Sequence, residues 1–73
     1  MNGGIIVKEL YNLGKNLKEL RLHYGYTQQQ VADSLEIKVS SYQAYEWGKA
    51  VPTLQNFIKL AKLFDVDYKE LLE

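Results

Sequence analysis

Thr27 to Gly48 reads TQQQVADSLEIKVSSYQAYEWG, and this stretch decides how the chain folds. It predicts two short helices joined by a tight corner at residues 35–37. Thr27 and Gln30 have the spacing of a capping box, in which each side chain accepts a hydrogen bond from the other residue's backbone N–H, so the first helix begins here. Ala32 is small enough for another helix to approach this one closely.

The second helix of this pair presents two different sides. One side carries two aromatic residues, Tyr42 and Tyr45, and suits a core. The other side carries only small or amide-bearing side chains, those of Val39, Ser40, Gln43 and Ala44. A helix with such an outer face is suited to insertion into a binding partner.

The residues before this stretch predict a longer helix and an N-terminal arm. Apolar residues recur every three or four positions, at Leu10, Leu13, Leu17, Leu20 and Tyr24. Gly25 is expected to end this helix in the left-handed conformation. Gly14 weakens its middle by about 1 kcal/mol relative to alanine, which places the start between residues 8 and 15. We expect residues 1–9 to form an arm whose apolar residues pack on the body or on a second subunit, although the same residues also fit a short strand or a helix start.

The residues after Gly48 predict two more helices. Lys49 to Pro52 forms a loop, because the residue before proline avoids helical geometry. Thr53 then caps a helix, and Asp67 caps the last one. The first of these helices has a wide apolar face, made of Leu54, Phe57, Ile58, Ala61 and Phe64 and broadened by Leu60 and Leu63. This width fits either a central helix or a helix with part of its face in a subunit interface.

Together these elements predict an all-α fold, a compact five-helix bundle that forms one domain at residues 10–73. With no cysteine and only one histidine, His23, the chain lacks the residues for disulfides, thiolate metal sites or a catalytic triad. We therefore expect no cofactor, no metal and no enzyme activity. No apolar run reaches the roughly 20 residues of a membrane span, and no basic segment precedes the short apolar run near the start, which predicts a cytoplasmic protein.

The formal net charge is zero, which by itself argues against a strongly electrostatic nucleic-acid binder. The distribution is less uniform, because basic residues prevail between Lys15 and Lys62 and acidic residues prevail from Leu63 onward. On charge alone, we interpret this pattern as an ordinary solvated surface.

Several short motifs follow one another in a consistent order. They are LKELR at 17–21, YTQ at 26–28, Val31-Ala32 with Leu35 and Ile37, YEWGKAVP at 45–52, and Leu60-Ala61. Over about residues 13–72, this pattern resembles the helix-turn-helix DNA-binding domains of phage repressors and Cro proteins, the XRE-like family. The resemblance implies a lambda-repressor-like bundle that binds double-stranded DNA, with its third helix in the major groove.

The resemblance also implies which residues contact DNA. The base edges would be contacted by Lys38, Val39, Ser40, Gln43 and Ala44, because lysine can donate to guanine, glutamine can pair with adenine, and valine and alanine suit the thymine methyl group. The DNA backbone would be contacted by Thr27, Gln28, Ser41, Trp47 and Lys49. A structural ion pair between Arg21 and Glu46 would tie the first helix to the end of the third, and a phosphate contact is the alternative role of Arg21.

Three positions depart from the family pattern. Glu36 stands at the corner, where the family has a glycine with positive φ, and this costs roughly 1–2 kcal/mol unless the corner relaxes. Lys38 stands where serine or threonine would cap the third helix. Trp47 stands where a polar residue is common, and covering the core or a partner subunit is an alternative to stacking on the DNA backbone.

The resemblance therefore implies a sequence-specific transcriptional regulator that binds a pseudo-palindromic operator as a homodimer, acting either as a repressor or by contacting polymerase. A toxin subunit or the polymerase is a further partner to consider. The alternative function is a protein-interaction module or antitoxin-type subunit that keeps the fold with weak or no DNA binding. Zero net charge and the missing cap at Lys38 favour this alternative.

Overall fold

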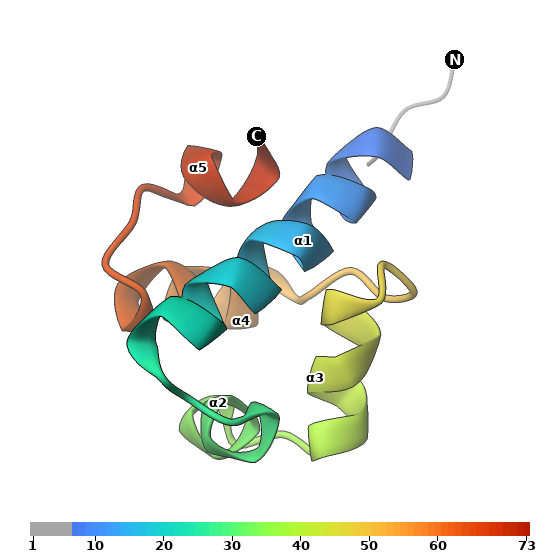
Figure 1. Cartoon of the computed structure of the whole chain (residues 1–73). Coiled ribbons are helices and arrows are strands. Elements are labelled where there is room, and N and C mark those ends of the chain that lie inside the picture. Colours follow the sequence, from blue (N-terminus) through green and yellow to red (C-terminus); the bar gives the residue numbers. More distant parts are fainter. Residues whose placement is uncertain (1–6) are drawn as a thin grey trace.

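The computed structural model describes residues 7–73, and this part of the chain folds into five helices (Figure 1). They are α1 (Val7–Tyr24), α2 (Gln28–Leu35), α3 (Val39–Glu46), α4 (Leu54–Leu63) and α5 (Tyr68–Leu72). The predicted all-α five-helix bundle is therefore confirmed. Residues 1–6 of the expected arm lie outside the described residues, whereas its last three residues, 7–9, form the first turn of α1.

The core draws on every helix. Its buried apolar residues are Leu13 and Leu17 of α1, Val31, Ala32 and Leu35 of α2, Tyr42 and Tyr45 of α3, Leu60 and Ala61 of α4 with Phe64 at its end, and Leu71 of α5. The stripe expected on α1 is thus buried in its middle, while Tyr24 at its end lies at the edge of the core. There Tyr24 stacks on the Phe64 ring and donates its hydroxyl hydrogen bond to the Phe64 carbonyl oxygen, at 3.1 Å.

The short helix α5 is held by side chains of α1. A five-residue helix is too short to be stable by itself, and its last carbonyl groups have no partner within the helix. Asn16 Nδ2 donates to the carbonyl oxygens of Glu70 and Leu71 at 3.1 and 3.0 Å, and Asn12 Nδ2 donates to that of Leu72 at 3.2 Å. Because the two asparagines are four residues apart, they lie on one face of α1 and together fix the end of α5.

Gly14 is the point where α1 crosses the end of α3. A Cβ atom at this position would clash with the backbone carbonyl oxygen of Glu46 and would lie 2.9 Å from that of Tyr45. Gly14 is therefore more than the weak point that the sequence predicts, because the glycine allows two backbones to approach closely. The predicted start between residues 8 and 15 is too late, because α1 begins at Val7 and continues through Gly14 without a break.

The predicted helix ends are present. Thr27 and Gln30 form a capping box, with the Thr27 Oγ1 atom accepting from Gln30 N at 3.0 Å and Gln30 Oε1 accepting from Thr27 N at 2.8 Å. Asp67 and Glu70 form a second box at the start of α5. Gly25 has φ +78°, so α1 ends in the left-handed conformation that the sequence predicts.

Candidate nucleic-acid interface

The corner between α2 and α3 is a tight left-handed turn. Glu36 has φ 60° and ψ 42°, and its backbone N–H bonds back to carbonyl oxygens of α2. The N–H of Ile37 also returns to the Ala32 carbonyl oxygen, at 3.0 Å. The corner has thus kept the geometry that suits glycine, and Ala32, one helical turn before it, is fully buried.

We predict that Glu36→Gly stabilises the protein by about 1 kcal/mol, because a residue with a Cβ atom is strained in the left-handed region. Urea unfolding would measure the change in the free energy of unfolding. Glu36→Ala is the matched control, since it removes the carboxylate but keeps the Cβ atom. Equal stabilisation by both variants would assign the effect to charge and contradict the strain at this corner.

The side of α3 that faces solvent is the side expected to contact bases. Tyr42 and Tyr45 are buried, and the opposite side exposes or half-exposes the candidate base-contacting residues Lys38, Val39, Ser40, Gln43 and Ala44. In Figure 1 the α2–α3 corner and α5 lie at opposite ends of the view, so α5 does not cover the corner. Lys38 occupies the N-cap position of α3 without a side-chain capping bond, as its sequence predicts.

The candidate backbone-contacting residues flank α3 on two elements. Thr27 and Gln28 lie at the start of α2, Ser41 is exposed on α3, and Trp47 and Lys49 follow the end of α3. The Trp47 side chain is 62% exposed, and Lys49 Nζ lies 5.6 Å from its ring centroid, a cation–π distance. This pair presents a positive charge on an aromatic surface next to the end of α3.

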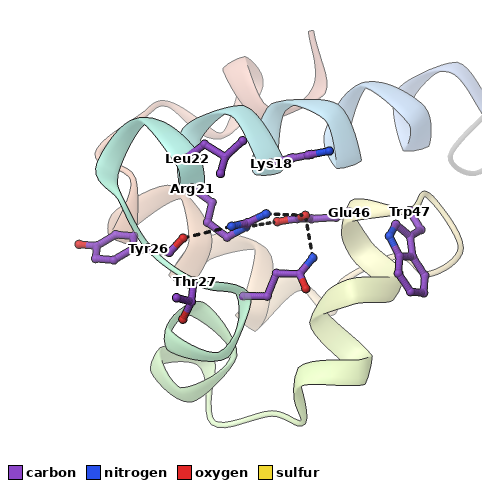
Figure 2. A pocket seen from close by; sticks show the side chains of 8 residues that line it. Lys18, Arg21, Leu22, Tyr26, Thr27, Glu46 and Trp47 are labelled. Carbon is purple, nitrogen blue, oxygen red and sulfur yellow. Dashed lines mark hydrogen bonds and ion pairs between the residues drawn. The ribbon is translucent and has the colours of Figure 1, made fainter.

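A groove of about 660 Å³ lies between α1, the start of α2 and the end of α3 (Figure 2). Thr27, Gln28 and Trp47 line it, and so does Lys18 of α1, which lies outside the predicted set of DNA-contacting residues. Its position three residues before Arg21 is the signal that would have placed it on the same helix face. Lys18 therefore adds a positive charge to this groove.

Arg21 and Glu46 form a two-point ion pair inside this groove. Arg21 Nε donates to Glu46 Oε2 at 2.6 Å, and Nη2 donates to Oε1 at 3.3 Å. The remaining Nη1 donates to the Tyr26 carbonyl oxygen at 3.1 Å (Figure 2). The side chains are only 10% and 2% exposed, so the pair ties the end of α1 to the end of α3 and to the loop before α2.

The charges of this pair stabilise each other. Burial alone would raise the pKa of Glu46, but hydrogen bonds from Arg21, and then from neighbouring polar side chains, outweigh it and hold that pKa below its ordinary value. The same hydrogen bond raises the pKa of Arg21. The pair is therefore charged at neutral pH.

Two glutamines extend this ion pair to the outer face of α3. Gln28 Nε2 donates to Glu46 Oε1 at 3.1 Å, and Gln28 Oε1 accepts from Gln43 Nε2 at 3.0 Å. Gln28 is consequently a half-buried link with both ends of its amide engaged, rather than a side chain that projects freely toward solvent. Gln43 keeps its Oε1 atom and one N–H for another partner, and its orientation is set from within the protein.

His23 and the acidic residues offer no comparable site. His23 lines a shallow groove with Glu19 and Glu70 between α1 and α5. Among residues 7–73, no three histidine, aspartate or glutamate side chains are grouped so that they could hold a metal ion. In the same part of the chain, none of the helices combines the length and the apolar character that crossing a bilayer requires.

Two short helices joined by a tight corner, the second with a solvent-exposed outer side, are the arrangement of a helix-turn-helix domain. The chain belongs to the helix-turn-helix domain family, whose model matches residues 14–73.

Its relatives include two phage-derived regulators. The chain is 42% identical to the SPbeta prophage-derived HTH-type transcriptional regulator YonR of Bacillus subtilis over 60 residues, which are 82% of this chain and 56% of YonR. It is 40% identical to the cryptic phage CTXphi transcriptional repressor RstR of Vibrio cholerae over 57 residues, which are 78% of this chain and 51% of RstR. The chain thus spans about half the length of these curated relatives.

A solved structure shares most of this fold. The crystal structure of the restriction-modification controller protein C.AhdI from Aeromonas hydrophila superimposes with a TM-score of 0.77 at 32% sequence identity. The match covers 85% of this chain and 94% of that one. The arrangement of the helices is therefore shared with a protein of similar size.

Proposed function

We propose that this chain is the DNA-binding domain of a transcriptional repressor that recognises a pseudo-palindromic operator as a homodimer. The observation that carries the proposal is the outward face of α3, where Gln43 is oriented by Gln28 on a scaffold fixed by the Arg21–Glu46 pair. The names of its phage-derived relatives, a transcriptional regulator and a transcriptional repressor, support the same function.

In this proposal α3 enters the major groove and Gln43 recognises adenine. Adenine offers an acceptor, N7, beside a donor, the N6 amino group, so a glutamine must present one N–H and its carbonyl oxygen together. Gln43 has these two groups left after one N–H is used by Gln28. Lys38 and Ser40 would contact neighbouring base edges, while Val39 and Ala44 would contact thymine methyl groups.

The phosphates would be held on both sides of α3. The N-terminus of α2 at Thr27 and Gln28 favours an anion, and Lys49 with Trp47 and the exposed Ser41 provide contacts along the adjacent backbone. Lys18 adds a positive charge to the groove beside them. In a dimer, the two recognition helices would reach half-sites about 34 Å apart on one face of the duplex.

The base-contact assignment is tested by selecting bound fragments from random duplex DNA. We predict that Gln43→Ala relaxes the preference at one base pair of each half-site, by roughly 1–3 kcal/mol. Gln29→Ala is the matched control, because Gln29 is an exposed glutamine of α2 that bonds to Asp33 instead of α3. An unchanged sequence profile for Gln43→Ala would refute the role of Gln43.

The link through Gln28 is tested with the same selection. Gln28→Ala is expected to relax the preference at the base pair that Gln43→Ala affects, because Gln43 loses its orienting partner. The double variant should then add little at that base pair, since both changes remove one contact. Additive effects would show that the two glutamines act independently.

Salt dependence separates the proposed function from a protein-interaction module. For DNA binding, the logarithm of affinity falls with the logarithm of salt with a slope of about −0.9 per phosphate contact. Lys49→Ala should make this slope shallower by about 0.9, the value of one phosphate contact, and should weaken binding to all DNA sequences alike. Absent or salt-independent binding would favour the interaction module, which the zero net charge and the uncapped start of α3 make the second candidate.

A toxin or polymerase partner finds no support in the names of the relatives.

A further inference from the structure

The outer face of α4 exposes a continuous apolar stripe. Leu54 is 74% exposed and Ile58 is 45% exposed, at i and i+4 of one face. Val51 in the preceding loop and Tyr68 at the start of α5 are 51% and 55% exposed. The half-buried Phe57 joins these residues, because its ring meets the Tyr68 ring edge-on at 6.3 Å. Contiguous apolar surface of this kind marks an interaction site rather than a solvated helix.

An apolar groove lies at one end of this stripe. It has a volume of about 250 Å³ and is lined by Leu13, Val51, Pro52, Leu54, Phe57 and Leu72. Within the described part of the chain, Leu54 is the most exposed of the large apolar residues, and it lines the groove. The surface thus carries a projecting aliphatic side chain and an aliphatic hollow side by side, as two copies of one surface need in order to interlock.

The other end of the stripe carries charges of both signs. A second hollow next to Ile58 is lined by Lys62 of α4 together with Asp65 and Asp67 from the connection to α5. In an isologous contact, the same patch meets itself across a two-fold axis, so it must contain both halves of every complementary pair. A patch with lysine and aspartate at one border of an apolar stripe meets this requirement.

We propose that a second copy of this chain packs on this surface, α4 against α4, around a two-fold axis near Ile58. This proposal rests on the proposed function, because it assigns the surface through which the operator-binding homodimer forms. With ten residues, α4 is only about 15 Å long, whereas a stable interface buries about 800 Å² per partner. Val51 and Tyr68 therefore belong to the interface together with α4.

Disulfide trapping tests the position of the axis directly. The chain has no cysteine, so Ile58→Cys introduces a single thiol. Near a two-fold axis, the two Cα atoms come within the roughly 7 Å that a disulfide allows, and mild oxidation should give a covalent dimer. Tyr11→Cys is the matched control, because Tyr11 is 66% exposed on α1, outside the stripe, and should stay uncoupled. Equal coupling of both variants, or none at position 58, would overturn the proposal.

Substitution of the stripe tests the interface without an engineered bond. Leu54→Lys and Ile58→Lys should weaken self-association in sedimentation equilibrium by at least about tenfold, because each places unpaired charge in an apolar contact. Tyr11→Lys should leave association unchanged, and the melting temperatures of all three variants should confirm an intact fold. Unchanged association of both stripe variants would place the dimer interface elsewhere.

DNA binding distinguishes failure of this proposal from failure of the proposed function. NMR titration with a single half-site duplex, taken from the selected operator, reports binding by one subunit. Ile58→Lys should still bind the half-site like the unmodified chain but should lose the gain that a full operator provides. Dimerisation through Ile58 without any half-site binding would support the interface and refute the DNA-binding function. Half-site binding by a chain that never dimerises on a full operator would refute the interface and support DNA binding.

Discussion

Arg21→Ala is expected to lower the free energy of unfolding by about 3–5 kcal/mol, because it leaves the buried Glu46 carboxylate without its partner. Chains of this size have stabilities on the order of 0.05–0.15 kcal/mol per residue, so the loss would bring the domain close to unfolding at room temperature. Denaturant unfolding followed by circular dichroism would measure the change. The free energy of unfolding should fall even where the DNA sequence preference of the folded variant is unchanged.

The chain contains a matched control for this prediction. Lys15 and Glu19 form an i, i+4 pair on the same helix at 3.4 Å, but their side chains are 55% and 62% exposed. Lys15→Ala should therefore cost less than about 0.5 kcal/mol. Replacing Arg21 and Glu46 together by methionine should restore much of the stability, because no charge is then left buried. An Arg21→Ala variant with an unaltered melting temperature would contradict the structural role of the pair.

The pair also predicts a pH dependence. Because the pKa of Glu46 is lower in the folded protein than in the unfolded chain, folding favours the charged carboxylate. Its contribution is complete above the unfolded pKa of roughly 4.3 and is lost as the pH falls through the folded pKa. Stability should thus decrease on acidification below pH 4 in the unmodified chain, and this decrease should be smaller in the double methionine variant.

Gly14→Ala is the second change with a large expected effect. Alanine would favour an isolated helix by about 1 kcal/mol. In this fold, however, its methyl group would overlap the Glu46 carbonyl oxygen at the crossing of α1 and α3. Forcing the two backbones apart should cost more than this gain, and we expect a net destabilisation of about 2 kcal/mol or more. Thermal unfolding monitored by calorimetry would give the value.

Gly25→Ala separates crowding from backbone conformation. Gly25 has a positive φ but no atom within 4 Å of the added Cβ, so its substitution should cost only about 1–2 kcal/mol of conformational strain. Gly14 is helical, and its cost is steric. If Gly14→Ala stabilised the protein, the close crossing of α1 and α3 would be wrong. The Gly14→Ala variant should also displace Glu46. The stability of this variant should therefore respond less to acidification than that of the unmodified chain.

Local sequence signals predicted most of the fold. The capping boxes at Thr27 and Asp67, the left-handed ends and the missing cap at Lys38 depend on residues within one turn of each other, and all are present. The split of α3 into a tyrosine side and an outer side follows from helical periodicity alone. Such features need no knowledge of how distant segments meet.

The features that were missed all depend on contacts between distant segments. Periodicity assigns Gly14 to a helix, but it does not reveal that the carbonyl oxygen of Glu46 lies against it. The bonds from Gln43 to Gln28 and from Gln28 to Glu46 depend on how α2 and α3 cross, so the family resemblance implied only a phosphate contact for Gln28. Lys18 was missed for the same reason, because the groove that it lines forms only where α1 meets the start of α2 and the end of α3.

The glutamine link has a consequence for retargeting this domain to a new DNA sequence. Any replacement at Gln43 deprives the Gln28 amide of a partner, and Gln28 in turn touches the carboxylate that balances Arg21. A library varied at position 43 alone would therefore be depleted of stable clones, whatever their base preference. Co-randomising positions 28 and 43 should recover far more functional specificities, because each new base contact can then be selected with a compatible neighbour.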